Sequence, residues 1–124
     1  MTSLMEIGQS LVDNCRAGTE RECLDQLYSR EAVSVEAMAS PEMGGAAITG
    51  LDAIKGKHDW WQSAFTVHDL QIGGPYIHGE DRFAVTFKMD TEEKATGKRD
   101  SMQEVAVYTV ADGKIVREEF FYTP

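Results

Sequence analysis

Four ionisable side chains occur among apolar residues in this sequence and could move protons: the carboxylates of Glu36, Glu104 and Glu118 and the imidazole of His58. A carboxyl group that faces an apolar space keeps its proton to a higher pH, and a second carboxyl group nearby raises the pKa further. Histidine titrates close to neutrality without any perturbation. We therefore predict a general acid–base site built from these four side chains, provided that the fold brings them together.

Two long β-rich runs, 102–111 and 114–122, contain two of these glutamates and are joined at Asp112-Gly113. This dipeptide predicts a tight hairpin, because glycine accepts the positive φ that the turn requires. A two-residue type I′ turn would pair Ala111 with Lys114, whereas a type I turn with a glycine bulge would pair Val110 with Lys114. We favour the bulge.

In the favoured register Glu104 and Glu118 share one face of the hairpin with Tyr108, since side chains alternate between the faces of a strand. The alternative is that one or both carboxylates face solvent or pair with Arg117. The opposite face carries Val105, Val107 and Phe121. Neither face is purely polar, so we expect one to be covered by helices and the other by a second copy of the chain.

The third glutamate belongs to a predicted strand over 32–38, where β-branched residues alternate with polar ones. If Val33 and Val35 point into the protein, Glu36 points out. The reverse alternation places Ser34 and Glu36 inside. Both orientations remain open at this point.

His58 lies on the apolar stripe of a predicted helix that begins near Thr49-Gly-Leu-Asp52. The stripe contains Leu51, Ile54, His58, Trp61 and Phe65. A histidine there is either a core residue or a proton carrier, and a neighbouring glutamate would indicate the second role.

The remaining elements predict one α+β domain over residues 1–124. Capping boxes at Ser3 and Thr19 begin two further helices, of which Gly18 ends the first. Gly73-Gly74-Pro75 interrupts a strand that begins near Val67, which indicates a bulge. Another strand covers 82–90. We expect a curved, mostly antiparallel sheet with three helices of the N-terminal half on its concave face and a cone-shaped pocket between them.

Six aromatic residues could wall this pocket, although packing in the core is the ordinary role of each. They are Trp60, Trp61, Tyr76, Phe83, Phe87 and Tyr108. The expected ligand is a small apolar or aromatic molecule.

Composition excludes several classes of function. The 124 residues carry a net charge of −9, which disfavours nucleic acid and anionic membranes as partners. The sequence has no signal-peptide pattern and no apolar run long enough to span a membrane, so we expect a cytoplasmic protein. Cys15 and Cys23 are expected to be reduced. Metal-ligand spacing and phosphate-binding loops are missing, so neither a metal nor a cofactor is predicted.

The order of these elements, with Gly50-Leu-Asp-Ala-Ile54 opening the third helix and Asp112-Gly-Lys-Ile-Val-Arg-Glu-Glu-Phe-Phe-Tyr122 closing the chain, resembles the SnoaL-like branch of the nuclear transport factor 2-like superfamily. The resemblance covers nearly the whole chain and implies a cone-shaped fold with a pocket, usually in a homodimer formed through the open sheet face. Members include polyketide cyclases, steroid isomerases, dehydratases and epoxide hydrolases, so the fold does not select a reaction.

The steroid isomerases of this superfamily need a tyrosine on their first helix. By the resemblance, Leu11 occupies the corresponding position in this sequence. Their base would fall at Ala37 or, with a one-residue slip, at Glu36, and their neutral acid near Ala106 or, with another slip, at Glu104. The resemblance therefore does not imply steroid isomerisation. We expect a cofactor-free cyclase-, isomerase-, dehydratase- or hydrolase-type enzyme that acts on a small apolar carbonyl compound. The alternative is a non-catalytic homodimeric binding module.

Overall fold

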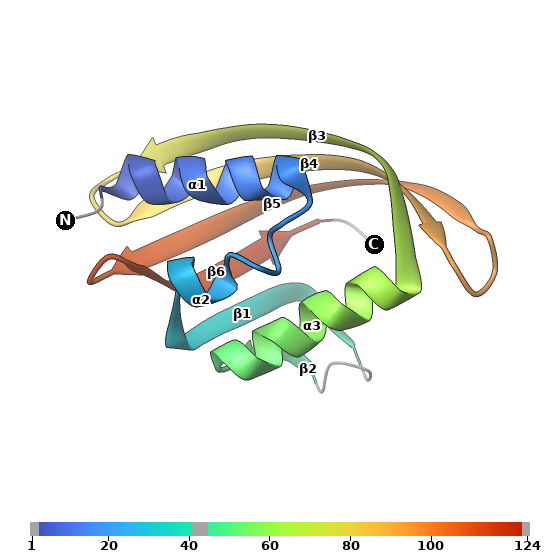
Figure 1. Cartoon of the computed structure of the whole chain (residues 1–124), viewed down its shortest axis with the longest axis horizontal. Coiled ribbons are helices and arrows are strands. Elements are labelled where there is room, and N and C mark those ends of the chain that lie inside the picture. Colours follow the sequence, from blue (N-terminus) through green and yellow to red (C-terminus); the bar gives the residue numbers. More distant parts are fainter. Residues whose placement is uncertain (1–2, 41–44, 123–124) are drawn as a thin grey trace.

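The computed structural model describes residues 3–40 and 45–122 (Figure 1). Three helices and six strands follow in this order: α1 (Leu4–Ala17), α2 (Leu24–Leu27), β1 (Tyr28–Ser40), β2 (Gly45–Thr49), α3 (Leu51–Ala64), β3 (Phe65–His78), β4 (Arg82–Glu93), β5 (Arg99–Ala111) and β6 (Lys114–Phe121).

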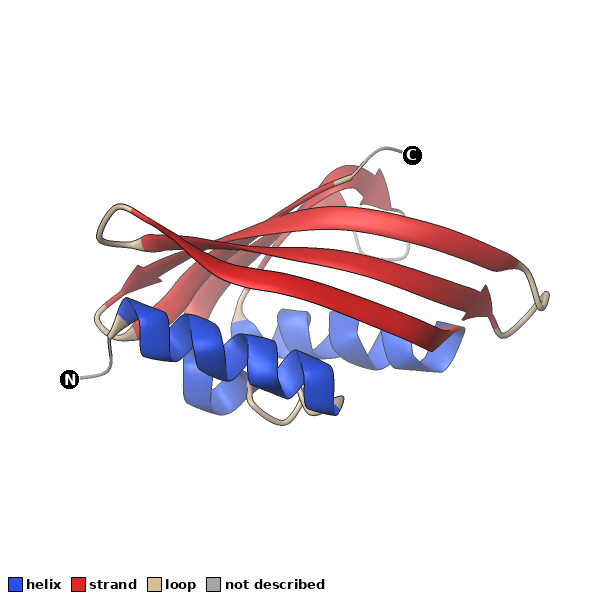
Figure 2. Cartoon of the chain, turned by 90° about the horizontal axis from the view of Figure 1, so that it is seen from above, coloured by secondary structure: helices blue, strands red, loops and turns tan. Residues whose placement is uncertain are grey.

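The six strands form one sheet in the order β2-β1-β6-β5-β4-β3. All neighbouring pairs are antiparallel except β1 and β6, which are parallel. The three helices lie on one side of the sheet, here called the inner face, and leave the outer face uncovered (Figure 2). The predicted α+β class with a mostly antiparallel sheet is confirmed. Among the described residues, no helix has the length and apolar character needed to cross a bilayer.

The first helix has the predicted ends. The Ser3 hydroxyl accepts a hydrogen bond from the Glu6 N–H while the Glu6 carboxylate accepts from the Ser3 N–H, and Gly18 ends the helix with a φ of 74°. The second helix is much shorter than predicted, because 19–23 forms turns and α2 has four residues, with Cys23 at its N-cap. The apolar spacing of this segment predicts a buried side formed by Cys23, Leu24, Leu27 and Tyr28, and all four side chains are buried.

Four strands, β1, β3, β4 and β5, are longer than their patterns indicated. β3 continues through Gly73-Gly74-Pro75, and its pairing with β4 shifts between Gly73 and Tyr76, as the predicted bulge requires. The glycine and proline content of residues 40–47 predicts a loop, but β2 begins within this segment at Gly45, and residues 41–44 lie outside the described residues.

The predicted turn between β5 and β6 is wrong. Asp112 and Gly113 both have positive φ (53° and 75°), and Ala111 pairs with Lys114, as in the two-residue type I′ turn. The register then shifts between Thr109 and Val110. This bulge within the strands, instead of at the turn, places Glu118 opposite Tyr108, so the predicted sharing of a face still holds.

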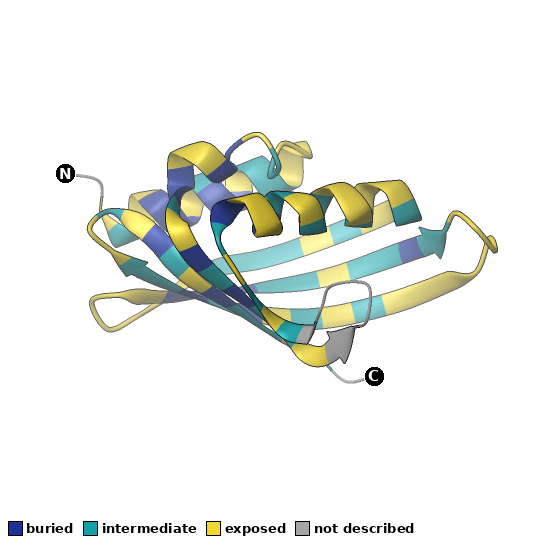
Figure 3. Ribbon diagram, turned by 90° about the horizontal axis from the view of Figure 1, so that it is seen from below, coloured by how far each residue is buried: buried dark blue, intermediate teal, exposed yellow. Residues whose placement is uncertain are grey.

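The hydrophobic core lies between α1, α2 and the inner face (Figure 3). Phe83 and Tyr108 stack in it with ring centroids 4.9 Å apart. Its other fully buried members include Ile7, Leu24, Ile54, Val85 and Ile115. The space under α1 is therefore filled by side chains.

Two mid-helix glycines allow a test of this packing. A methyl group added at Gly8 of α1 would meet Pro75 Cβ at 2.8 Å and Phe83 Cδ2 at 3.3 Å, whereas one added at Gly56 of α3 would meet no atom within 4 Å. We expect Gly8→Ala to lower the free energy of unfolding by about 1–2 kcal/mol, because overpacking exceeds the gain in helix propensity. Gly56→Ala should raise it by about 0.5–1 kcal/mol. Urea titration measures both, and a stabilising Gly8→Ala would contradict the close approach of α1 to the sheet.

Candidate functional site

A lysine on α3 lies at the centre of the ionisable groups of the inner face. Lys57 Nζ forms an ion pair with Glu36 Oε1, lies 3.7 Å from Glu118 Oε2 and donates to Ser34 Oγ at 2.8 Å. It also lies 4.3 Å from the centroid of the Phe120 ring, a cation–π distance. Glu36, Lys57 and Glu118 are called the carboxylate–lysine cluster below.

The innermost member of the cluster is Glu118, which is 1% exposed. One of its carboxylate oxygens accepts a hydrogen bond from the Tyr28 hydroxyl, and the other accepts from Ser34 Oγ at 2.6 Å. These bonds replace the water that the carboxylate loses on burial. The predicted alternatives for Glu118, solvent exposure or pairing with Arg117, are wrong. Arg117 pairs instead with Glu119 at 3.3 Å, and the register places that pair on the outer face.

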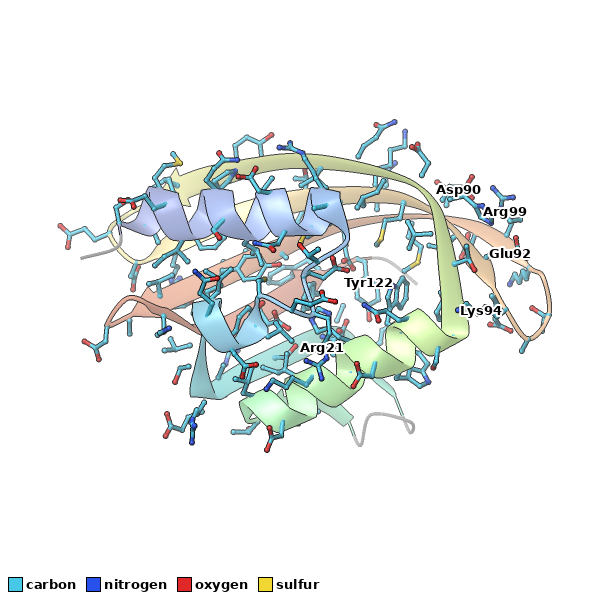
Figure 4. All side chains as sticks on the ribbon, viewed as in Figure 1. Arg21, Asp90, Glu92, Lys94, Arg99 and Tyr122 are labelled. Atoms are coloured by element: carbon cyan, nitrogen blue, oxygen red, sulfur yellow. The ribbon has the colours of Figure 1, made fainter. Side chains whose placement is uncertain are left out.

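The cluster becomes more exposed towards the C-terminal end of β6. The side chains of Lys57 and Glu36 are 13% and 14% exposed. Tyr122, just after β6, donates to Glu36 Oε2 at 3.1 Å and lies between the strand end and α3 in Figure 4. A chain of polar contacts thus connects the buried Glu118 to the partly exposed Glu36 and Tyr122.

Strand register explains this arrangement. Ser34 pairs with Glu118 across the parallel β1–β6 ladder, while Val33 and Val35 pair with Arg117 and Glu119 on the other face. Of the two orientations left open for β1, the structure has Ser34 and Glu36 inside. Lys57 reaches the same place because it follows the buried Ile54 by three residues on α3.

Glu104 completes the group from β5. It pairs with Phe87 of β4 on the inner face and is half-buried. Burial, followed by the nearby charge of Glu36, raises its pKa to about 7. Lys57 opposes this shift and Glu118 adds to it. Glu104 is therefore a carboxyl group that can give or take a proton near neutral pH.

His58 takes no hydrogen bond to a glutamate in the described structure. Burial lowers its pKa, against the attraction of Glu118. The imidazole is therefore expected to be neutral at pH 7.

The six aromatic candidates separate into three groups. Phe83 and Tyr108 are part of the packed core, where burial holds the pKa of the Tyr108 hydroxyl well above its usual range. Tyr76 is 56% exposed and pairs with Ala84, which places it away from the cluster. Trp60, Trp61 and Phe87 remain partly exposed, and Trp61 stacks on Phe65 at 4.5 Å.

A wide hollow of about 930 Å³ extends over β3–β6. Seven of its eleven lining residues alternate onto the outer face, among them Lys88, Val105 and Phe121. Glu104 and Tyr122 also border it. The hollow thus lies mainly across the sheet from the helices, outside the cone that the sequence led us to expect.

Sequence reasoning missed Lys57, Ser34, Tyr28 and Tyr122 as members of the site. Lys57 is flanked by charged and polar residues and does not belong to the apolar stripe of its helix. The signal that could have found it is its three-residue spacing from Ile54. No group of three or more His, Cys, Asp or Glu side chains within 3–40 and 45–122 is arranged to hold a metal ion.

Comparison with known proteins gives the family. A family model described as a SnoaL-like domain matches residues 3–122. A crystal structure from Mesorhizobium loti, described as a candidate SnoaL-like polyketide cyclase, is similar with a TM-score of 0.88 and 37% identity over 97% of this chain and 99% of that one.

Two other solved structures share the fold at 15% identity. A candidate polyketide cyclase from Pseudomonas putida has a TM-score of 0.74, covering 99% of this chain and 93% of that one. A protein of unknown function with a cystatin-like fold from Xanthomonas campestris has a TM-score of 0.77, covering 98% and 92%. No curated protein matches the chain. With a family model that matches almost its full length, the chain belongs to the SnoaL-like domain family.

Proposed function

We propose that this protein is a cofactor-free enzyme that moves protons on a small, mostly apolar carbonyl compound, as cyclases, isomerases and dehydratases do. The observation that carries the proposal is the proximity of two unlike carboxyl groups: Glu104, whose pKa burial and the charge of Glu36 raise to about 7, and Glu36, which Lys57 and Tyr122 hold in place. Two carboxyl groups with different environments are suited to different roles, one as acid and one as base.

The proton transfers follow from the contacts of each carboxyl group. Glu36 is ion-paired with Lys57, so it is expected to be ionised and to accept a proton from the carbon next to the carbonyl. Glu104 in its protonated form donates a hydrogen bond to the carbonyl oxygen, where negative charge develops. The Tyr122 hydroxyl donates its proton to Glu36 Oε2 and helps to hold this base in place.

The surroundings favour an apolar substrate. Phe87 pairs with Glu104 on the inner face, and Trp61 and Phe65 form a partly exposed aromatic pair at the end of α3. The description of the Mesorhizobium loti relative as a candidate polyketide cyclase is consistent with carbonyl chemistry. We also place the protein in the cytoplasm, where Cys15 and Cys23 would remain free thiols, as they are here.

Hydrogen–deuterium exchange tests this proposal without knowledge of the natural substrate, because removal of the proton next to the carbonyl is common to these reactions. We expect the protein to accelerate exchange at that carbon in small cyclic ketones or 1,3-dicarbonyl compounds dissolved in D₂O, followed by proton NMR. Glu36→Gln should reduce the rate by about 10²–10⁴-fold, the usual contribution of a general base.

Glu119→Gln is the matched control, since Glu119 is on β6 but on the outer face. Its exchange rate should equal that of the unmodified protein. Equal loss of activity in both variants, or no acceleration by the unmodified protein for any of the compounds, would argue against the proposed chemistry.

The raised pKa of Glu104 also predicts how stability depends on pH. Between about pH 4.5 and pH 7 the folded state holds a proton on Glu104 that the unfolded state has lost, so stability falls as pH rises through this window. Relative to Glu104→Gln, the protein should lose about 1–3 kcal/mol of unfolding free energy between pH 4.5 and pH 8. Urea titrations of both proteins at several pH values measure the difference. Parallel pH profiles would mean that Glu104 titrates as an ordinary surface glutamate.

We propose a homodimer formed through the outer face as the assembly of the protein, and a non-catalytic dimeric binding module as the second candidate function. Val105 and Phe121 are cross-strand neighbours on the outer face and are 40% and 49% exposed. Exposed apolar pairs in the middle of a sheet are common at protein–protein contacts.

Light scattering coupled to gel filtration measures the assembly. We expect twice the mass of the 124-residue chain, and Val105→Glu should reduce it to one chain by placing a charge in the contact. Lys94→Glu, in the β4–β5 connection, serves as a control that should remain dimeric. A monomer at high protein concentration would remove this candidate.

A further inference from the structure

The carboxylate–lysine cluster has a feature that acid–base chemistry alone does not require: one ammonium group serves two carboxylates at different depths. Lys57 Nζ lies against Glu36 Oε1 on its exposed side and 3.7 Å from Glu118 Oε2 on its buried side. The Glu118 oxygens are already satisfied by two hydroxyl groups. Glu118 is therefore available to Lys57 mainly as a fixed negative charge.

Two further contacts restrict the lysine side chain. The Nζ atom donates to Ser34 Oγ at 2.8 Å, and the Phe120 ring lies 4.3 Å from it. Ser34 in turn donates to Glu118, so the hydroxyl links the cation to the buried anion. A lysine side chain has high rotamer entropy, and these contacts on β1 and β6 are what hold it in one place.

We propose that Lys57 is the positioning residue of the site: with the buried Glu118 as its counter-charge, it holds Glu36 ionised and in place as the base, and thereby leaves the proton of the site on Glu104. This inference rests on the proposed acid–base function for its chemical consequence, although its electrostatic part can be tested separately.

The charges that face the cluster support this role. Glu36, Glu104 and Glu118 bring three carboxyl groups to the inner face, with Lys57 as the cation in direct contact with two of them. Tyr28, Tyr122 and the neutral His58 add hydrogen-bonding groups without a compensating positive charge. Without Lys57, the negative charges of neighbouring carboxylates would repel one another and favour binding of a proton. Glu36 and Glu104 would then no longer have distinct roles as base and acid.

The test counts protons at pH 8, using infrared absorption of protonated carboxyl groups. Lys57→Met is expected to retain about one more protonated carboxyl group per chain than the unmodified protein, because unpaired neighbouring carboxylates resist ionisation together. Lys57→Arg should restore the original count, since it keeps the charge. Lys55→Met is the matched control: Lys55 is on the same helix but pairs with the exposed Asp25 at 2.6 Å, so the count should not change.

Lys57→Met could fail to fold because it leaves the buried Glu118 without a counter-charge, so the same comparison is also made in the Glu118→Gln variant. Glu118→Gln removes the buried charge, and adding Lys57→Met to it leaves Glu36 and Glu104 as neighbours without a cation. The double variant should again retain an extra protonated carboxyl group relative to Glu118→Gln. Equal counts in both comparisons would overturn the proposal.

Activity separates this inference from the proposed reaction. In the exchange assay, the double variant should be at least about tenfold slower than Glu118→Gln, with its pH profile displaced, as expected when a general base loses its positioning partner. If the proton count depends on Lys57 but no carbonyl compound exchanges, the proposed reaction fails and the electrostatic role of Lys57 stands. If exchange is fast and insensitive to Lys57, the positioning role fails instead.

Discussion

The burial of one carboxylate, Glu118, is the constraint on which the site depends. An ionised carboxylate placed between a helix and a sheet would destabilise the fold unless other groups replace its water. Here Tyr28 and Ser34 provide hydroxyl groups and Lys57 provides the opposite charge. Because these partners come from the start and middle of β1 and from α3, satisfying Glu118 fixes how the strand and the helix lie against β6.

The same requirement organises the more exposed part of the site. Once Lys57 is drawn towards Glu118, its ammonium group is also in reach of Glu36, two residues beyond Ser34 on the inner face. Glu104 on β5 is close enough for these charges to shift its pKa, but it has no hydrogen bond or ion pair of its own among the described contacts. The cation contacts Glu36 and Glu118, whereas burial and the neighbouring carboxylates raise the pKa of Glu104 to about 7.

The sequence predicted the architecture because local patterns carry it. The capping box at Ser3, the glycine that ends α1 and the alternation in β4 and β5 each determine their own element. The hairpin faces were predicted correctly in spite of the wrong turn, because two one-residue shifts in the same direction move the pairing by two residues and so keep the alternation of faces: the turn is one residue tighter, and the register shifts again between Thr109 and Val110.

The site could be predicted only in part. Glu104 and Glu118 were found because they interrupt apolar strands, but the direction in which Glu36 points depends on the β1–β6 pairing, a contact across more than 80 residues that no local pattern contains. Lys57 was missed for a related reason. Its surroundings in the sequence are polar, and only the tertiary contact with a buried glutamate makes it an inner residue. Phe83 and Tyr108 were equally compatible with a core and with a pocket wall, and the helices of this chain pack against them.

Direct titration of the Glu104 carboxyl group tests the central claim, that the carboxylate–lysine cluster leaves one neighbouring carboxyl group able to exchange its proton near neutrality. Carbon-13 NMR of the side-chain carboxyl resonances, with Glu104 assigned by comparison with Glu104→Gln, gives the midpoint. The structure predicts a pKa of about 7 for Glu104. A midpoint close to 4.5, the value of a glutamate free in water, would contradict the account.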